Sequence, residues 1–390
     1  MLLPSATATV EPNDAQTVLG LHEVWKGYCI TARAIILFSS AATAGQRVAG
    51  LPAAARAVRE AVLAGFDHCI VAAPEGWRPD RASLVEIARL CPAATVEFAT
   101  EVQAMATASP DTLLISGERQ VEARDLRLAM SGGPMDGVLP IRDAEFSVLC
   151  HLRNGGGASA LALAGRRILA ATAKSGDGIV SRVLNRRISQ GISGVLLRSS
   201  AIRPVHATIA SALIALVMMG WLIQGSERGL IIAGLLFQLA SIIDGVDGEI
   251  ARATFRSSPR GAMIDSLVDA ATNLGFIGGV VLSLYAQGET RAAIAGGFGL
   301  AMLASGLTLI GRRSRNDHAG LTFDAVKTHF SVQRSRIMTW LTWLTMRDFF
   351  ALVGAVLIIA GFAPQALMLF AVVATGWLAV VVTVMGREPA

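Results

Sequence analysis

The sequence predicts a two-part protein, a soluble α/β domain followed by an all-α integral membrane domain of six transmembrane helices. Of the 390 residues, 53% are hydrophobic and only 16% are charged, which is too apolar for an ordinary soluble protein of this length. The apolar excess begins near residue 204, whereas residues 1–200 mix charged side chains with short apolar runs. We therefore expect a cytosolic domain over 1–175, an interfacial helix over 176–203 and a membrane domain over 204–390.

The N-terminal part has the pattern of a Rossmann-like α/β domain. Residues 34–74 read as a strand, a glycine-containing loop, an amphipathic helix and a second strand, with the strands at Ile35–Phe38 and Cys69–Ala72. The four cysteines lack CxxC spacing, so we expect reduced thiols rather than disulfides or metal ligands. They are Cys29, Cys69, Cys91 and Cys150.

A basic amphipathic segment precedes the apolar half. In DGIVSRVLNRRISQGISGVLLRSSAIRP, apolar side chains recur at helical spacing and arginines lie between them. This pattern predicts a helix in the membrane interface, with Arg182, Arg186 and Arg187 among the lipid headgroups. A simple linker helix is the alternative.

Six apolar segments are each long enough to cross a bilayer, which takes roughly 20 residues. Basic residues crowd the even-numbered connections and the C-terminus. The positive-inside rule places these connections and the N-terminal domain in the cytoplasm, on the inner face of the cell membrane. The segments run over approximately 205–225, 229–251, 262–286, 292–311, 344–362 and 365–386.

Unusual charge lies in SIIDGVDGEIARATFRSSPRGAMIDSLVDAATN, residues 241–273. Asp244 and Asp247 are three residues apart, and Asp265 and Asp269 are four apart, so each pair shares one helix face. Each charge at membrane depth costs about 2.5–3.5 kcal/mol, and a hard divalent cation, Mg²⁺ or Mn²⁺, would offset that cost. Arg252 is placed to bind phosphate or to balance the acids. An ion-pair cluster or a proton relay in a transporter are the alternatives.

The same stretch resembles the signature of the CDP-alcohol phosphotransferase family, D-x2-D-G-x2-A-R-x8-G-x3-D-x3-D. Its eight fixed positions are all met, which makes a chance match negligible. They are Asp244, Asp247, Gly248, Ala251, Arg252, Gly261, Asp265 and Asp269. The resemblance implies a six-helix membrane fold with a site, near the cytoplasmic face, that holds two Mg²⁺ or Mn²⁺ ions and the diphosphate of a CDP-alcohol.

The resemblance also implies roles for the residues. The four aspartates look like metal ligands, and Asp269 looks like the general base as well. Many relatives carry Pro-Asn and a nearby Thr where the first span begins; here Pro204 and Thr208 are kept and Val205 stands where Asn is common. The residues expected to contact the nucleotide are Asp244, Gly248, Ala251, Arg252, Gly261 and Thr208.

The donor and acceptor are expected to be a CDP-alcohol, either CDP-diacylglycerol or a soluble CDP-polyol, and a hydroxyl compound, a phosphorylated polyol. Arg312, Arg313 and Arg347 lie at the predicted cytoplasmic ends of spans four and five and are candidates to bind the acceptor phosphate. Positive-inside anchoring is the alternative for each of them. Membrane lipids and a second copy in a homodimer are the expected partners, and nucleic acid is not.

The N-terminal domain resembles sugar-phosphate nucleotidyltransferases, but it departs from their nucleotide loop. The loop reads SSAATAGQR, so the glycine pair is replaced, and Glu118 stands where an Asp metal ligand is expected. A loop without its glycines brings fewer backbone N–H groups to a triphosphate, which favours a degenerate domain. The domain order resembles the bifunctional inositol-phosphate cytidylyltransferase and di-myo-inositol-phosphate-phosphate synthase group. A bifunctional enzyme and a non-catalytic transporter or scaffold therefore remain alternatives.

Overall fold

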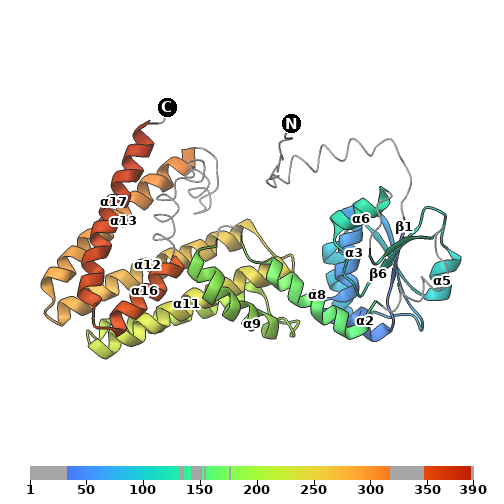
Figure 1. Cartoon of the computed structure of the whole chain (residues 1–390), viewed down its shortest axis with the longest axis horizontal. Helices are drawn as coiled ribbons and strands as arrows, with labels where there is room; N and C mark the ends of the chain where they lie inside the picture. Colours follow the sequence, from blue (N-terminus) through green and yellow to red (C-terminus); the bar gives the residue numbers. More distant parts are fainter. Residues whose placement is uncertain are drawn as a thin grey trace, which may run out of the picture. The chain divides into compact units, whose positions relative to one another are not determined.

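The computed structural model describes residues 33–131, 136–141, 152, 155–174, 177–316 and 347–387. The chain forms two compact units, drawn in Figure 1. Unit 1 comprises Met1–Gln46 and Pro52–Leu161, and unit 2 comprises Arg47–Leu51 and Ala162–Ala390. The boundaries at 175 and 203 that the sequence pattern predicts remain predictions.

Unit 1 contains the α/β fold that the sequence predicts. Its five-stranded sheet has the order β5-β4-β1-β6-β7, in which β7 alone is antiparallel to its neighbour. The predicted strand at 69–72 lies within β4, and the one at 35–38 overlaps β1, which ends one residue earlier at Leu37. The strands are β1 (Arg33–Leu37), β4 (His68–Ala73), β5 (Thr95–Thr100), β6 (Leu113–Ser116) and β7 (Val138–Pro140).

The parallel strands of unit 1 are buried because their sequences are almost continuously apolar. Ile35, Leu37, Ile70 and Leu114 are fully or almost fully buried in one core. Helix α3 lies against β1, β4 and α6 (Figure 1). The helices are α2 (Ala41–Gly45), α3 (Ala53–Ala64), α4 (Arg81–Leu90), α5 (Glu101–Ala106), α6 (Ala123–Met130) and, across the boundary between the units, α8 (Gly157–Ala171).

Unit 2 is helical, and five of its helices are long and apolar enough to cross a membrane. These five correspond to predicted spans one to four and six. The fifth predicted span is represented by α16 (Arg347–Ile359), which is shorter, and residues 317–346 before it lie outside the described part of the chain. The long helices are α10 (Pro204–Ile223), α11 (Glu227–Ala253), α12 (Pro259–Ala286), α13 (Thr290–Asn316) and α17 (Ala363–Arg387).

Two packing arrangements hold these helices together. One core joins α10, α11, α12 and α16 and also takes in the first part of α13 and of α17, and in it the rings of Phe237 and Phe276 stack with centroids 4.0 Å apart. In the second arrangement α13 and α17 lie side by side (Figure 1). Small residues permit this close approach, because a Cβ added at Gly299 would lie 2.7 Å from the Cα of Ala371.

The basic segment before the first span forms two consecutive helices, η3 (Ser181–Asn185) and α9 (Arg186–Leu196). Its apolar side chains, including Ile179, Val183 and Val195, are exposed, as expected of a helix in a membrane interface. Arg182 and Arg187 are exposed as well. The expectation that Arg186 reaches the headgroups is wrong, because this side chain is buried in ion pairs.

The contact between α13 and α17 gives a stability prediction. We expect Gly299→Ala to lower the free energy of unfolding of the full-length protein by about 1–3 kcal/mol, because backbone atoms of α17 cannot move aside without separating the two helices. Gly297→Ala is the matched control, since nothing lies within 4 Å of a Cβ at that position of the same helix. Thermal unfolding in detergent measures both variants. Equal stability of the two would contradict the packing argument.

Candidate active site

The candidate site is built where α11 ends and α12 begins. The connection is short, and Phe255 takes a left-handed conformation, with φ of 54°, as the chain reverses. Ser258 then caps α12 by accepting a hydrogen bond from the backbone N–H of Gly261 at 3.1 Å, and Pro259 occupies the first helical turn. The turn brings the C-terminal part of α11 beside the N-terminal part of α12.

Three of the four predicted aspartates come together at this turn. Asp247 is buried and shares a hydrogen bond with Asp265, and Asp244 interacts electrostatically with both carboxylates. Thr208, on α10, donates a hydrogen bond from Oγ1 to Oδ2 of Asp247 at 2.8 Å. Asp269 lies one turn after Asp265 on α12 and is half-buried. The predicted carboxylate set is therefore drawn from two helices and is oriented by a third.

These residues suit a divalent cation in their chemistry. Asp244, Asp247 and Asp265 offer hard oxygen donors from two helices, and Mg²⁺ and Mn²⁺ prefer such donors. The hydrogen bond between Asp247 and Asp265 needs a proton between two acids, and a cation could replace that proton. In the described part of the chain, no three His, Cys, Asp or Glu side chains already stand close enough to hold a metal ion. Coordination would therefore require the carboxylates to turn toward a common point.

The small residues and the arginine of the signature lie beside the aspartates. A Cβ added at Gly248 would lie 3.0 Å from a guanidinium nitrogen of Arg252, so the glycine makes room for that side chain. Arg252 donates from Nε to the carbonyl oxygen of Thr172 at 2.8 Å. Ala251 is half-buried and Gly261 is exposed. An anionic ligand at the aspartates would thus meet a guanidinium next to it.

A second buried acid on α11 was missed by sequence reasoning. Glu249 is fully buried and accepts hydrogen bonds from Arg186, Ser189 and Ser193. Burial lowers the pKa of the Arg186 guanidinium, but bonds to Asp177 and Glu249 outweigh burial, so its pKa lies above the ordinary value. The available signal was an acid inside an apolar run that also had basic residues upstream.

The acceptor candidates can be placed only along the backbone. Arg312 and Arg313 lie in the last part of α13, and Arg347 is the first residue of α16. Their side chains lie outside what the structure describes. Whether they approach the aspartates therefore remains a prediction.

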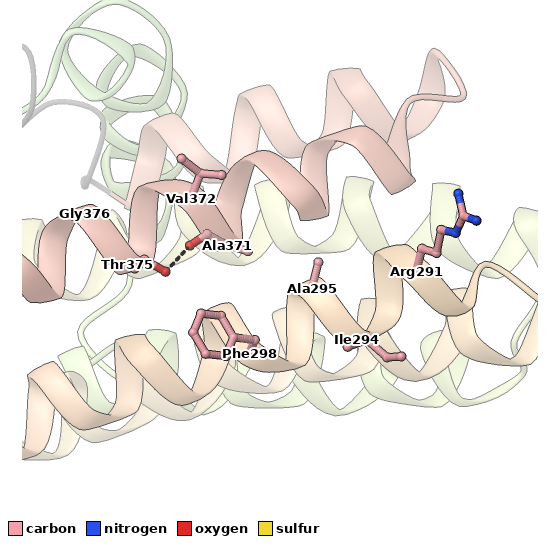
Figure 2. Close-up of a pocket in the computed structure, with 8 residues that line it drawn as sticks. All are labelled: Arg291, Ile294, Ala295, Phe298, Ala371, Val372, Thr375 and Gly376. Atoms are coloured by element: carbon pink, nitrogen blue, oxygen red, sulfur yellow. Dashed lines mark hydrogen bonds between the residues drawn. The ribbon is translucent and has the colours of Figure 1, made fainter.

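A hollow of about 700 Å³ lies between α13 and α17 (Figure 2). Apart from Arg291 and Thr375 its lining is apolar, and Thr375 donates its hydroxyl to the carbonyl of Ala371 at 2.8 Å. The lining contains none of the signature residues, so the hollow is not part of the candidate site.

Unit 1 contains its own buried carboxylate, Glu118, just after β6. Glu118 accepts hydrogen bonds from the backbone N–H and the hydroxyl of Ser39, which follows β1, and from the N–H of Gly157 at 2.6 Å. Ligands of doubly wound α/β folds bind at this carboxyl end of the strands. Next to it, a Cβ added at Gly117 would lie 2.3 Å from the ring of Phe38. The carboxylate is engaged by the protein's own loops.

Two of the cysteines lie in the described residues, and both are free thiols. Burial raises the pKa of Cys69 to about 12 and that of Cys91 to about 11. Both thiols are therefore protonated at neutral pH and are poor nucleophiles and metal ligands.

Comparison with known proteins identifies a family model that matches most of unit 2. The family model described as CDP-alcohol phosphatidyltransferase matches residues 202–385. A bifunctional IPC transferase and DIPP synthase of Archaeoglobus fulgidus is 37% identical over 133 residues, 34% of this chain and 26% of the relative. Its namesake in Rubrobacter xylanophilus is 39% identical over 138 residues, 35% of this chain and 30% of the relative.

A shorter relative is matched over most of its length. The archaetidylinositol phosphate synthase of Pyrococcus horikoshii is 26% identical over 167 residues, which are 39% of this chain and 85% of the relative. This chain thus spans only about a quarter to a third of the length of the bifunctional relatives.

Proposed function

Because residues 202–385 match the CDP-alcohol phosphatidyltransferase family model, we propose that this protein is a membrane-embedded CDP-alcohol phosphotransferase. It transfers a substituted phosphate from a CDP-alcohol to a hydroxyl acceptor and releases CMP. The observation that carries the proposal is the meeting of Asp244, Asp247 and Asp265 at the turn between α11 and α12. The complete signature supports the same reaction.

We assign the aspartates to divalent metal, two Mg²⁺ or Mn²⁺ ions held by Asp244, Asp247, Asp265 and Asp269. Bound metal would neutralise the donor's diphosphate and make its β-phosphorus a better electrophile. Thr208 holds the Asp247 carboxylate in place through its 2.8 Å hydrogen bond. A supporting hydrogen bond of this kind fixes the direction of a ligand's oxygen atoms.

Asp269 serves as general base in this proposal. It takes the proton of the acceptor hydroxyl as the acceptor oxygen bonds to the β-phosphorus, and the bond from that phosphorus to the bridging oxygen breaks. CMP leaves with the bridging oxygen. The nucleotide is proposed to contact Asp244, Gly248, Ala251, Arg252, Gly261 and Thr208.

The acceptor is proposed to be a phosphorylated polyol of the inositol phosphate class. The name of the Pyrococcus horikoshii relative, archaetidylinositol phosphate synthase, supports this class. Arg312, Arg313 and Arg347 are proposed to bind its phosphate, because guanidinium groups bind phosphate oxygens in pairs. The donor is CDP-diacylglycerol or a soluble CDP-polyol.

We further propose an inner-membrane protein of six spans that forms a homodimer among membrane lipids. In this proposal α16 belongs to the fifth of the six spans. The site and the N-terminal domain would then face the cytoplasm, as the positive-inside rule predicts from the basic connections.

We propose that unit 1 is a degenerate nucleotidyltransferase-like domain serving assembly or regulation. The bonds from Ser39 and Gly157 to Glu118 support this, because the carboxylate's oxygen atoms already hold two loops together. A second candidate is a bifunctional enzyme that also makes its CDP-alcohol from CTP, and the names of two relatives favour it.

The reaction is tested by metal removal. We expect the full-length protein in membranes to release CMP from a CDP-alcohol and acceptor in the presence of Mg²⁺ or Mn²⁺. Excess EDTA should abolish this release and added metal should restore it, because clustered carboxylates without a cation repel one another and the diphosphate. CMP is measured by chromatography. Undiminished CMP release in EDTA would disprove metal dependence, and no CMP with any CDP-alcohol would favour a transporter or scaffold.

The role of Asp269 has its own test. We expect Asp269→Asn to keep donor binding while turnover falls by about 10²–10⁴-fold, as for loss of a general base. Donor binding is measured directly and turnover is measured as CMP release. Asp111→Asn, a similar change at an exposed position of unit 1, should leave both unchanged. Retention of more than about a tenth of wild-type turnover would exclude the base role.

The division of labour between the units is tested with CTP. We expect the full-length protein to release no pyrophosphate from CTP and a polyol phosphate, since Glu118 is engaged inside unit 1. A pyrophosphate assay with an active cytidylyltransferase as positive control measures this. CTP-dependent pyrophosphate release would establish the bifunctional candidate instead.

A further inference from the structure

A buried cluster of hydrogen bonds and ion pairs surrounds Glu249 in the described part of unit 2. Its carboxylate is fully buried and accepts hydrogen bonds from Nη1 of Arg186 at 3.0 Å, from Ser189 Oγ at 2.6 Å and from Ser193 Oγ at 2.6 Å. All three donors lie on α9, and each is about one turn from the next, so they share one face of that helix. Both oxygen atoms of the carboxylate are therefore fixed from one direction.

Arg186 connects this carboxylate to the segment that precedes η3. Its Nε and Nη2 donate to the two oxygens of Asp177 at 2.8 and 3.1 Å. Asp177 in turn accepts a hydrogen bond from the backbone N–H of Lys174 at 3.1 Å. The same segment accepts the 2.8 Å bond from Arg252 to the carbonyl of Thr172. It is thus joined to α11 both through Arg186 and Glu249 and through Arg252.

The position of Glu249 on α11 decides what this connection controls. At 3.6 residues per turn, Glu249 lies about 140° around the helix from Asp244, so it does not share the face of the aspartates. Gly245, one turn before Glu249, faces α9 closely, since a Cβ there would lie 3.4 Å from Ser189 Oγ. The contact with α9 therefore sets how far α11 is rotated about its own axis.

We propose that Glu249 and Arg186 are positioning residues, whose buried pair holds α11 in the rotation at which Asp244 and Asp247 face Asp265. This inference rests on the proposed function for the reaction that the aspartates perform. A rotation of a few tens of degrees would move the aspartate oxygens by more than the tolerance of a Mg²⁺ site, which demands near-ideal geometry. In this proposal both residues act through the aspartates rather than by binding substrate.

The test compares neighbouring arginines on one helix. Arg186→Gln and Glu249→Gln are made in the full-length protein, with Arg187→Gln and Glu227→Gln, both exposed, as matched controls. Mn²⁺ affinity is measured without substrate by electron paramagnetic resonance of free Mn²⁺. We expect it to weaken about 10–100-fold in the two positioning variants, as for loss of a residue that orients metal ligands, and to stay unchanged in the controls. CMP release should need correspondingly more Mn²⁺.

A purely structural role would lower thermal stability and leave Mn²⁺ affinity unchanged at temperatures where the variant is folded. That outcome would overturn the proposal. If the charge variants do not fold, the double variant Ser189→Ala with Ser193→Ala decides, because it removes two donors and leaves the ion pair. We expect it to weaken Mn²⁺ binding several-fold, and wild-type affinity would overturn the proposal. A wild-type protein that binds Mn²⁺ but releases no CMP would instead refute the proposed function alone.

Discussion

Negative charge on α11 has to be balanced at the edge of an apolar bundle. Neighbouring acids on this helix have different partners. Asp244, Asp247 and Glu249 occur within six residues, where each unbalanced charge costs about 2.5–3.5 kcal/mol at membrane depth. Glu249 is balanced inside the protein by Arg186 and two hydroxyls. The two aspartates face a third acid, Asp265, which also interacts electrostatically with Lys174. An exchangeable cation can supply the balance there, and that is the condition under which a ligand can bind.

The internal pair determines how the preceding helices are oriented. In η3 and α9 the polar residues Asn185, Arg186, Ser189 and Ser193 are buried, whereas apolar residues such as Val183 and Val195 are exposed. This is the reverse of an amphipathic helix on a water-soluble protein, and it fits a helix with lipid on its outer side. Removal of one partner from a buried ion pair is costly, on the order of 3–5 kcal/mol, so the orientation is strongly specified.

The sequence predicts those features of the fold and site for which a pattern has few structural alternatives. Apolar length predicts membrane spans directly, and the spacing of Asp244, Asp247 and Asp265 predicts that two antiparallel helices bring them together. The pairing of Arg186 with Glu249 could not be predicted, because arginines at this spacing suit lipid headgroups equally well and the two residues are 63 positions apart. The signature leaves position 249 open, so its acid carried no assigned role. Asp269 could be placed on its helix, but its role depends on a bound acceptor.

Glu118 and Glu249 are both fully buried acids, and their partners distinguish their functions. Glu249 lies on α11, which also bears Asp244 and Asp247, and is held by the guanidinium of Arg186 on α9, so its placement can affect the proposed chemistry without contact with substrate. Glu118 accepts from Ser39 and Gly157, which follow β1 and open α8, at the strand ends where an α/β domain would bind its ligand. Oxygen atoms that hold two loops together are not available to hold a metal–triphosphate. This supports the proposal that Glu118 serves the folding of unit 1 and that the aspartates of unit 2 carry out the chemistry.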